Sequence, residues 1–144
     1  MSDVSQVHAQ PFLTRRVSII NMIKKHILVV DDDSSLRALF QALLESYGYT
    51  SETAANGWDA LTRIAQARFD TVLLDYMMPG ITGLAVLQYM QRHHPSIPVL
   101  MLTGHAEGPV AAQALAAGAR VCLSKPFNCA ELKEALNFMV EMNA

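Results

Sequence analysis

The sequence predicts an α/β domain: an open, doubly wound sheet of five parallel strands with helices on both faces. Apolar runs of four or five residues alternate five times with segments whose apolar residues recur at helical spacing. Most of these runs are continuously apolar, which is typical of parallel strands that are buried on both faces. The chain has 144 residues, of which 51% are hydrophobic, so it is long and apolar enough for one buried core.

The first strand and helix give the clearest pattern. Ile27 to Val30 is apolar throughout and predicts a strand. Ser34 is the expected N-cap of the following helix, and Gly48 is the residue at which that helix should end. The apolar residues at helical spacing between these two positions are Leu36, Leu39, Phe40, Leu43 and Tyr47.

The second and third strands follow after turn residues. Thr50 to Ala54 predicts a weak second strand, and Thr71 to Leu74 predicts the third. Between them, the Asn56-Gly57 turn leads into a helix. The apolar residues of that helix are Ala60, Leu61 and Ile64.

The last two units begin after a break at Pro79 and Gly80. The sequence then predicts a helix with Leu84, Leu87 and Met90 on one face, a fourth strand at Val99 to Leu102, and an alanine-rich helix at Val110 to Ala117 that Gly118 ends. Val121 to Leu123 predicts the fifth strand. Asn128 and Glu131 are spaced as a capping box for a last helix, whose inward face is Leu132, Leu136 and Met139.

Charge and composition exclude several classes of protein. The formal net charge is −2, and the first 25 residues hold four basic side chains against one acidic one. The rest of the chain is therefore acidic and lacks the basic stripe that direct binding to nucleic acid requires.

Met22, followed by lysines and an apolar run, is spaced like a second translation start. We therefore expect residues 1–24 to be an N-terminal extension and residues 25–144 to form the folded domain.

The sequence predicts a soluble, cytoplasmic protein that does not enter membranes. Its apolar runs are too short to span a bilayer, and the N-terminus lacks a signal peptide. Cys122 and Cys129 are spaced more widely than a metal-binding or redox pair, so we expect both to be reduced structural thiols.

Chemically reactive side chains gather where the predicted strands end. Doubly wound sheets bind ligands at the carboxyl ends of their strands, so these positions are the candidate site. The candidates, in chain order, are Asp31, Asp32, Asp33, Asp75, Thr103, Ser124 and Lys125. We expect Asp33 to be a loop or capping residue of the helix that follows it.

These residue types favour phosphoryl transfer to a carboxylate. Carboxylates from two strand ends repel each other unless a cation lies between them, and Mg²⁺ prefers oxygen ligands. Thr103 supplies a hydroxyl donor, and Lys125 supplies a charge that can pair with a carboxylate or a phosphoryl oxygen. In such a reaction the protein mainly positions oxygens and neutralises their charge.

Four segments of the chain resemble the receiver domain of two-component response regulators, the CheY-like domain. They are ILVVDDDSSLR, TVLLDYMMPG, VLMLTG and LSKPF, in this order and at the spacing that the family shows. The resemblance covers the chain from about Lys25 to the last helix. It implies a (βα)5 flavodoxin-like receiver fold with strand order 2-1-3-4-5.

The resemblance also implies a role for each residue. Asp75 would be the phosphoacceptor, and Thr103 and Lys125 would contact the phosphoryl group. The implied ligands of Mg²⁺, or of Mn²⁺ in its place, are Asp31, Asp32, Asp75 and the backbone carbonyl of Met77. The phosphodonor would be a sensor histidine kinase, a histidine phosphotransfer protein or a small acyl phosphate. The receiver would catalyse only its own phosphorylation and dephosphorylation.

The sequence is compatible with more than one route by which the signal would leave such a receiver. We expect a stand-alone receiver that switches the binding of a protein target or relays the phosphate. The alternative is an excised receiver of a larger DNA-binding transcriptional regulator. The predicted fourth helix, from Val110 to Ala117, carries no charged side chain and could form a homodimer together with the fifth strand. Cys122 stands where the family usually has Tyr or Phe, so the usual aromatic reporter of activation is missing.

Other functions fit the sequence less well. An aspartate-nucleophile phosphatase of the haloacid dehalogenase type would need a second Asp two residues after Asp75, where this chain has Met77. A flavodoxin-like cofactor binder would need a phosphate-cradling loop after the first strand, where this chain has carboxylates. The absence of a Gly-Lys pair excludes a Walker-type phosphate loop.

Overall fold

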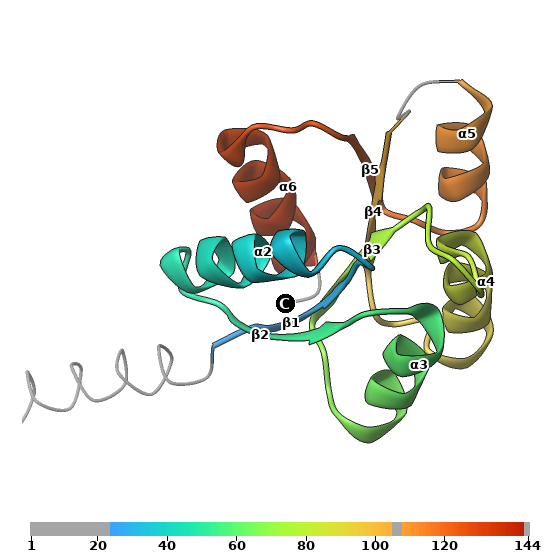
Figure 1. Ribbon diagram of the computed structural model, residues 1–144, viewed down its shortest axis with the longest axis horizontal. Helices are drawn as coiled ribbons and strands as arrows, with labels where there is room; N and C mark the ends of the chain where they lie inside the picture. The colour runs from blue at the N-terminus through green and yellow to red at the C-terminus, as the bar shows by residue number, and fades with distance from the viewer. Residues whose placement is uncertain (1–23, 105–107, 143–144) are drawn as a thin grey trace, which may run out of the picture.

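The computed structural model describes residues 24–104 and 108–142, and within them five parallel strands form one sheet (Figure 1). The strands are β1 (His26–Val30), β2 (Thr50–Ala54), β3 (Thr71–Asp75), β4 (Val99–Thr103) and β5 (Val121–Ser124). Their order across the sheet is β2-β1-β3-β4-β5. The doubly wound parallel sheet and its predicted strand order are therefore confirmed.

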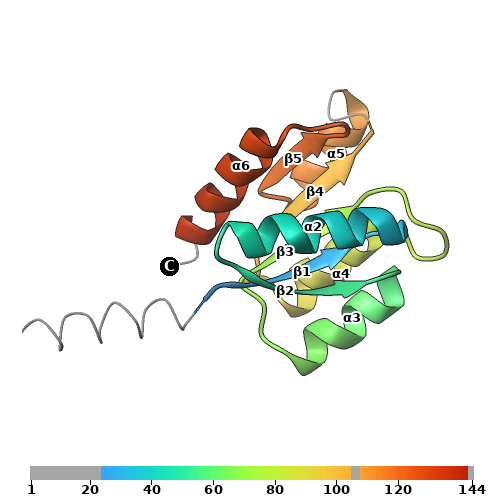
Figure 2. The same ribbon diagram turned by 60° about the vertical axis from the view of Figure 1, so that its left-hand side comes forward.

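Helices cover both faces of the sheet, as the two views in Figures 1 and 2 show. Helices α2 (Ser34–Ser46) and α6 (Cys129–Met142) cover one face. The opposite face is covered by α3 (Gly57–Gln66), α4 (Gly83–His93) and α5 (Pro109–Ala116). Neighbouring strand residues such as Val29 and Val30 belong to different apolar clusters because successive side chains point to opposite faces.

The order of the strands brings the candidate site together. β1 and β3 are neighbours, with Val30 beside Leu74, so the residues that follow these positions emerge side by side. β4 lies next to β3, and Thr103 pairs with Ser124 at the ends of β4 and β5. All four strand ends therefore open onto the same edge of the sheet, which is the edge that binds ligands in this architecture.

Two predictions about α2 are wrong. The N-cap is Asp33 rather than Ser34: its Oδ1 accepts hydrogen bonds from the backbone N–H of Ser35 at 2.8 Å and of Leu36 at 3.2 Å. Leu39 is 49% exposed, although its spacing suggested a core position, whereas Leu44 is fully buried and was missed. The capping role that we expected for Asp33 is confirmed.

The remaining elements agree with the sequence to within one or two residues. β3, β4 and β5 each extend one residue further than predicted, so Asp75, Thr103 and Ser124 are the last residues of their strands. The cap of α6 is confirmed, because Asn128 Oδ1 accepts the backbone N–H of Glu131 at 2.7 Å. Its predicted inward face, Leu132, Leu136 and Met139, is fully buried.

The structure tests two expectations about the whole chain only over the residues that it describes. Within residues 24–104 and 108–142, no helix has the length and apolar character needed to cross a membrane. Of the expected N-terminal extension, residues 1–23 lie outside the described residues.

Candidate functional site

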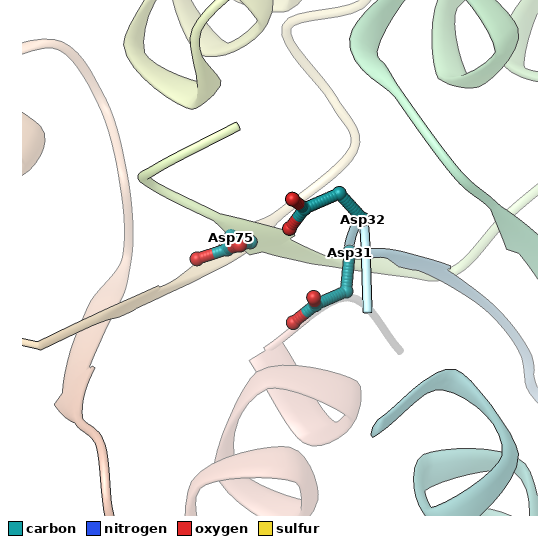
Figure 3. Close-up of side chains that lie close together, drawn as sticks. All are labelled: Asp31, Asp32 and Asp75. Atoms are coloured by element: carbon teal, nitrogen blue, oxygen red, sulfur yellow. The ribbon is translucent and has the colours of Figure 1, made fainter. Parts of the chain in front are cut away.

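Three carboxylates meet at the ends of β1 and β3 (Figure 3). Asp31 and Asp32 directly follow β1, and Asp75 is the last residue of β3. One carboxylate oxygen from each of the three lies within 4.8 Å of the others. Asp31 and Asp75 are only 1% and 4% exposed, whereas Asp32 faces solvent. The predicted convergence of these residues is therefore observed.

Lys125 connects the two buried carboxylates. Its Nζ donates to Asp31 Oδ2 at 3.0 Å and to Asp75 Oδ1 at 3.2 Å. The lysine comes from the residue after β5, so its side chain reaches past β4 to the central strands. Its backbone N–H donates to the carbonyl of Thr103 at 2.7 Å, which ties the end of β5 to the end of β4.

The proton affinities of this site follow from burial and from charge. Burial raises the pKa of Asp75, and the charge of Asp31 raises it further, while Lys125 offsets part of the effect. Burial alone would lower the pKa of Lys125. The hydrogen bond that Lys125 donates to Asp31 and the charges of both carboxylates outweigh this effect, so the pKa of Lys125 is raised. The lysine is therefore held in its charged form.

The donor set fits a hard divalent cation. Three ionised carboxylates and one ammonium leave two negative charges at the site, which a divalent cation would balance. Every ligand atom offered by this cluster is a carboxylate oxygen, and Mg²⁺ is bound by one or two carboxylates together with waters and phosphates. The exposed side of Asp32 leaves the cluster open to solvent for such waters.

Thr103 and Met77 flank the carboxylates in different ways. Thr103 ends β4 and is buried, at 2% exposure. Met77 lies two residues after Asp75, and its backbone N–H points at Asp75 Oδ1 at 3.4 Å while its side chain is 71% exposed. A thioether cannot act as a general acid or base, so this position does not supply the second carboxyl group that a dehalogenase-type phosphatase would need.

The start of α4 packs closely against the backbone of Asp75. The N–H of Gly83, the first residue of α4, donates to the carbonyl of Tyr76 at 3.2 Å. A Cβ atom at Gly83 would overlap the carbonyl oxygen of Asp75. Only glycine therefore allows α4 to begin so close to the candidate phosphoacceptor.

Two features lie beside the site, and the first of them was not found from the sequence. Arg37, on α2, donates from Nη1 to the backbone carbonyl of Asp31 at 2.8 Å. An open apolar groove of about 450 Å³ also lies between α2 and residues 125–129, and Lys125 is part of its lining. Its lining residues are Leu36, Leu39, Leu43, Lys125, Pro126, Phe127 and Cys129. The exposed Leu39, misplaced by its helical spacing, belongs to this groove.

The fold and this site are those of a receiver domain, and the chain belongs to the response regulator receiver domain family, which it matches over residues 27–137. Transcriptional regulatory protein ZraR of Salmonella typhimurium is 41% identical over 113 residues, which are 78% of this chain and 26% of ZraR. The chain therefore spans about a quarter of the length of that curated relative. Receiver domains of this family are typically signalling modules.

Solved receiver structures superpose on the chain. Chemotaxis protein CheY4 of Vibrio cholerae has a TM-score of 0.75 and 36% identity, over 81% of this chain and 98% of that structure. Response regulator protein TrrA of Thermotoga maritima, solved in complex with Mg²⁺ and BeF, has a TM-score of 0.73 and 35% identity, over 80% of this chain and 98% of that structure. Both structures match almost completely, so the likeness extends over the whole receiver fold.

Proposed function

We propose that this chain accepts a phosphoryl group on Asp75 and that phosphorylation changes its binding to a protein partner. The proposal rests on one observation: the buried carboxylate of Asp75 lies beside Asp31, and a single lysine bonds to both. Burying a charged carboxylate beside another carboxylate raises the free energy of the folded state. A carboxylate that served only folding stability would therefore be more favourable in solvent.

The transfer step uses the carboxylate as the nucleophile. An oxygen of Asp75 attacks the phosphorus of a phosphohistidine, the P–N bond breaks, and its electron pair stays on the donor imidazole. The ammonium of Lys125 is within reach of the added phosphoryl oxygens, because it already contacts Asp75 at 3.2 Å. We assign to the Thr103 hydroxyl the role of a further donor to these oxygens.

The proposed metal ligands are Asp31, Asp32, Asp75 and the backbone carbonyl of Met77. Mg²⁺, or Mn²⁺ with a similar preference for oxygen, would neutralise the charge of the phosphoryl oxygens and of the carboxylates when it is bound. The cluster of three carboxylate oxygens within 4.8 Å supports this ligand set. The similarity to TrrA, which was solved with Mg²⁺ and BeF, is consistent with it.

The apolar groove beside Lys125 is the proposed docking surface for the phosphodonor. A histidine kinase or histidine phosphotransfer protein must bring its phosphohistidine within bonding distance of Asp75. The groove borders the site through Lys125 and presents apolar side chains that include Leu39 and Phe127. Burial of these side chains would stabilise the complex in which transfer occurs.

The output is proposed to be a change in protein binding. A phosphoryl group adds charge to the site, and movement of Thr103 and Lys125 toward it would alter the adjoining segments. The surface formed by α5 and β5, with Leu115 half exposed, is the candidate for binding a target or a second copy. Because the matched part of ZraR is 26% of a transcriptional regulatory protein, a receiver that controls DNA-binding domains is the second candidate.

Intact-mass spectrometry after incubation with phosphoramidate and Mg²⁺ tests the proposal. The native chain should gain the mass of one phosphoryl group, and it should not do so when Mg²⁺ is chelated. Asp75→Ala should gain none, whereas Asp59→Ala, which removes a carboxylate on α3, should be labelled like the native chain. Equal labelling of Asp75→Ala, or an unlabelled native chain, would contradict the proposal. Rapid release of inorganic phosphate without an adduct would favour a phosphatase.

A further inference from the structure

Arg37 holds the peptide bond between the two carboxylates that follow β1. Its Nη1 donates to the carbonyl of Asp31 at 2.8 Å, from a position within α2 and six residues further along the chain. This carbonyl and the N–H of Asp32 belong to the same planar peptide unit. The hydrogen bond therefore fixes the plane from which the Asp32 side chain departs.

Asp32 depends on its backbone more than the other two carboxylates do. Asp31 is held through Lys125 and through the N–H of Asp33, which donates to Asp31 Oδ1 at 2.9 Å. Asp75 is also bonded to Lys125. Within the described part of the chain, the Asp32 carboxylate has neither a hydrogen bond nor an ion pair. Its direction toward the other carboxylates must therefore come from the backbone that carries it.

We infer that Arg37 is a positioning residue for the metal site, because it fixes the Asp31–Asp32 peptide so that Asp32 faces Asp31 and Asp75. This inference rests on the proposed function, since it requires that a divalent cation binds there. Arg37 does not touch the cation in this account. It acts as an outer partner of a ligand, and loss of such partners typically weakens metal binding by about 10- to 100-fold.

The charge of Arg37 and its hydrogen bond have opposite effects on metal binding. A guanidinium near the site repels a cation, so removing the charge alone would tighten binding. Removing the hydrogen bond frees the peptide and should weaken binding. Arg37 forms no ion pair with any residue in the described ranges, so its replacement releases no carboxylate to complicate the comparison. The direction of the change in affinity therefore separates the two roles.

Mn²⁺ titration of the full chain, with free Mn²⁺ read from its electron paramagnetic resonance signal, measures this affinity without any phosphoryl donor. Arg37→Met should bind Mn²⁺ about tenfold more weakly than the native chain, at the lower end of the outer-shell range. Arg37→Lys keeps the charge and one donor, and it should fall between the two. Arg92→Met is the matched control, because Arg92 is exposed in the last turn of α4 and forms no ion pair within the described residues. It should bind like the native chain.

The outcomes distinguish this inference from the proposed function. A native chain that binds no Mn²⁺, or an Asp32→Asn variant that binds as tightly as the native chain, would overturn the metal site itself. If the native chain binds through Asp32 and Arg37→Met binds equally or more tightly, only the positioning role of Arg37 is overturned. Circular dichroism at the titration temperature establishes that each variant is folded. If Arg37→Met is unfolded, the same comparison is made with Arg37→Lys, whose affinity must then be below native.

Discussion

Replacing Lys125 by Met is expected to destabilise the protein strongly without metal and only weakly with Mg²⁺. Lys125 Nζ lies 3.0 Å from Asp31 and 3.2 Å from Asp75, and the two carboxylates lie within 4.8 Å of each other. At an effective dielectric constant of about 20, two like charges at that separation repel by about 3.5 kcal/mol. Lys125 contacts both carboxylates, whereas Arg37, the other cation beside Asp31, bonds to its backbone carbonyl. Without the lysine, this repulsion is therefore offset much less.

The expected loss is smaller than that repulsion. Removing one partner from a buried ion pair typically costs about 3–5 kcal/mol. The side chain of Lys125 is 24% exposed, so water screens part of the repulsion. Protonation of Asp75, whose pKa is already raised by burial and by Asp31, limits the loss further. We expect a decrease of about 2 kcal/mol in the free energy of unfolding, which for a chain of this size lowers the midpoint by roughly 6–8 °C.

Thermal unfolding followed by circular dichroism, in EDTA and in saturating Mg²⁺, measures this effect. The cation supplies the charge that the lysine supplied, so Lys125→Met should gain more stability from Mg²⁺ than the native chain does. Arg120→Met is the matched control, because it removes one exposed cation just before β5. If Lys125→Met loses the same stability in EDTA and in Mg²⁺, or no more than Arg120→Met loses, the electrostatic reasoning is refuted.

Three further predictions test the surroundings of the site. The pKa of Asp75 is raised in the folded chain, so its contribution to stability is present below the ordinary aspartate pKa and lost as the pH rises. Without metal, Asp75→Asn should therefore have a higher unfolding midpoint than the native chain at pH 7, and the difference should become smaller in acid. Gly83→Ala should lower the urea midpoint of unfolding and slow phosphorylation, because the added methyl group overlaps the Asp75 carbonyl. A variant with native stability in urea and a native rate of mass labelling would contradict this. The pKa of Glu52 is lowered, mainly by its hydrogen bond with His26, so Glu52→Gln should be less stable than native at pH 7 and equal to it below the lowered pKa; a constant difference in urea titrations across pH would contradict this.

The strands and the meeting of the carboxylates could be predicted because topology determines both. Continuous apolar runs identify strands that are covered on both faces, and parallel strands bring their carboxyl ends to one edge. The approach of Asp75 to Asp31 follows from the adjacency of β3 and β1 alone. No side-chain contact had to be known: the apolar runs located the strands, and the resemblance to receiver domains implied their order.

The details of α2 could not be predicted because they depend on choices between neighbouring residues. Asp33 and Ser34 are both good N-caps, and only the path of the loop after β1 decides which oxygen meets the free N–H groups. Leu39 and Phe40 lie about 100° apart on the helix, so a small rotation decides which of them is buried. The sheet buries Phe40 together with Leu44 and leaves Leu39 in the groove beside Lys125.

The side-chain links across the site are the part that sequence patterns do not encode. Arg37 lies within an ordinary helix, and its contact with the Asp31 carbonyl spans six residues, a separation that belongs to no helical or strand period. Lys125 follows β5, a strand that is not adjacent to β1, so its contact with Asp31 requires a long side chain to cross the end of β4. Both cations approach the same aspartate from opposite ends of the chain, one at its carbonyl and one at its carboxylate. Both bonds depend on tertiary geometry. The strand-end aspartates alone therefore do not define the charge balance of the site, which arises only in the folded chain.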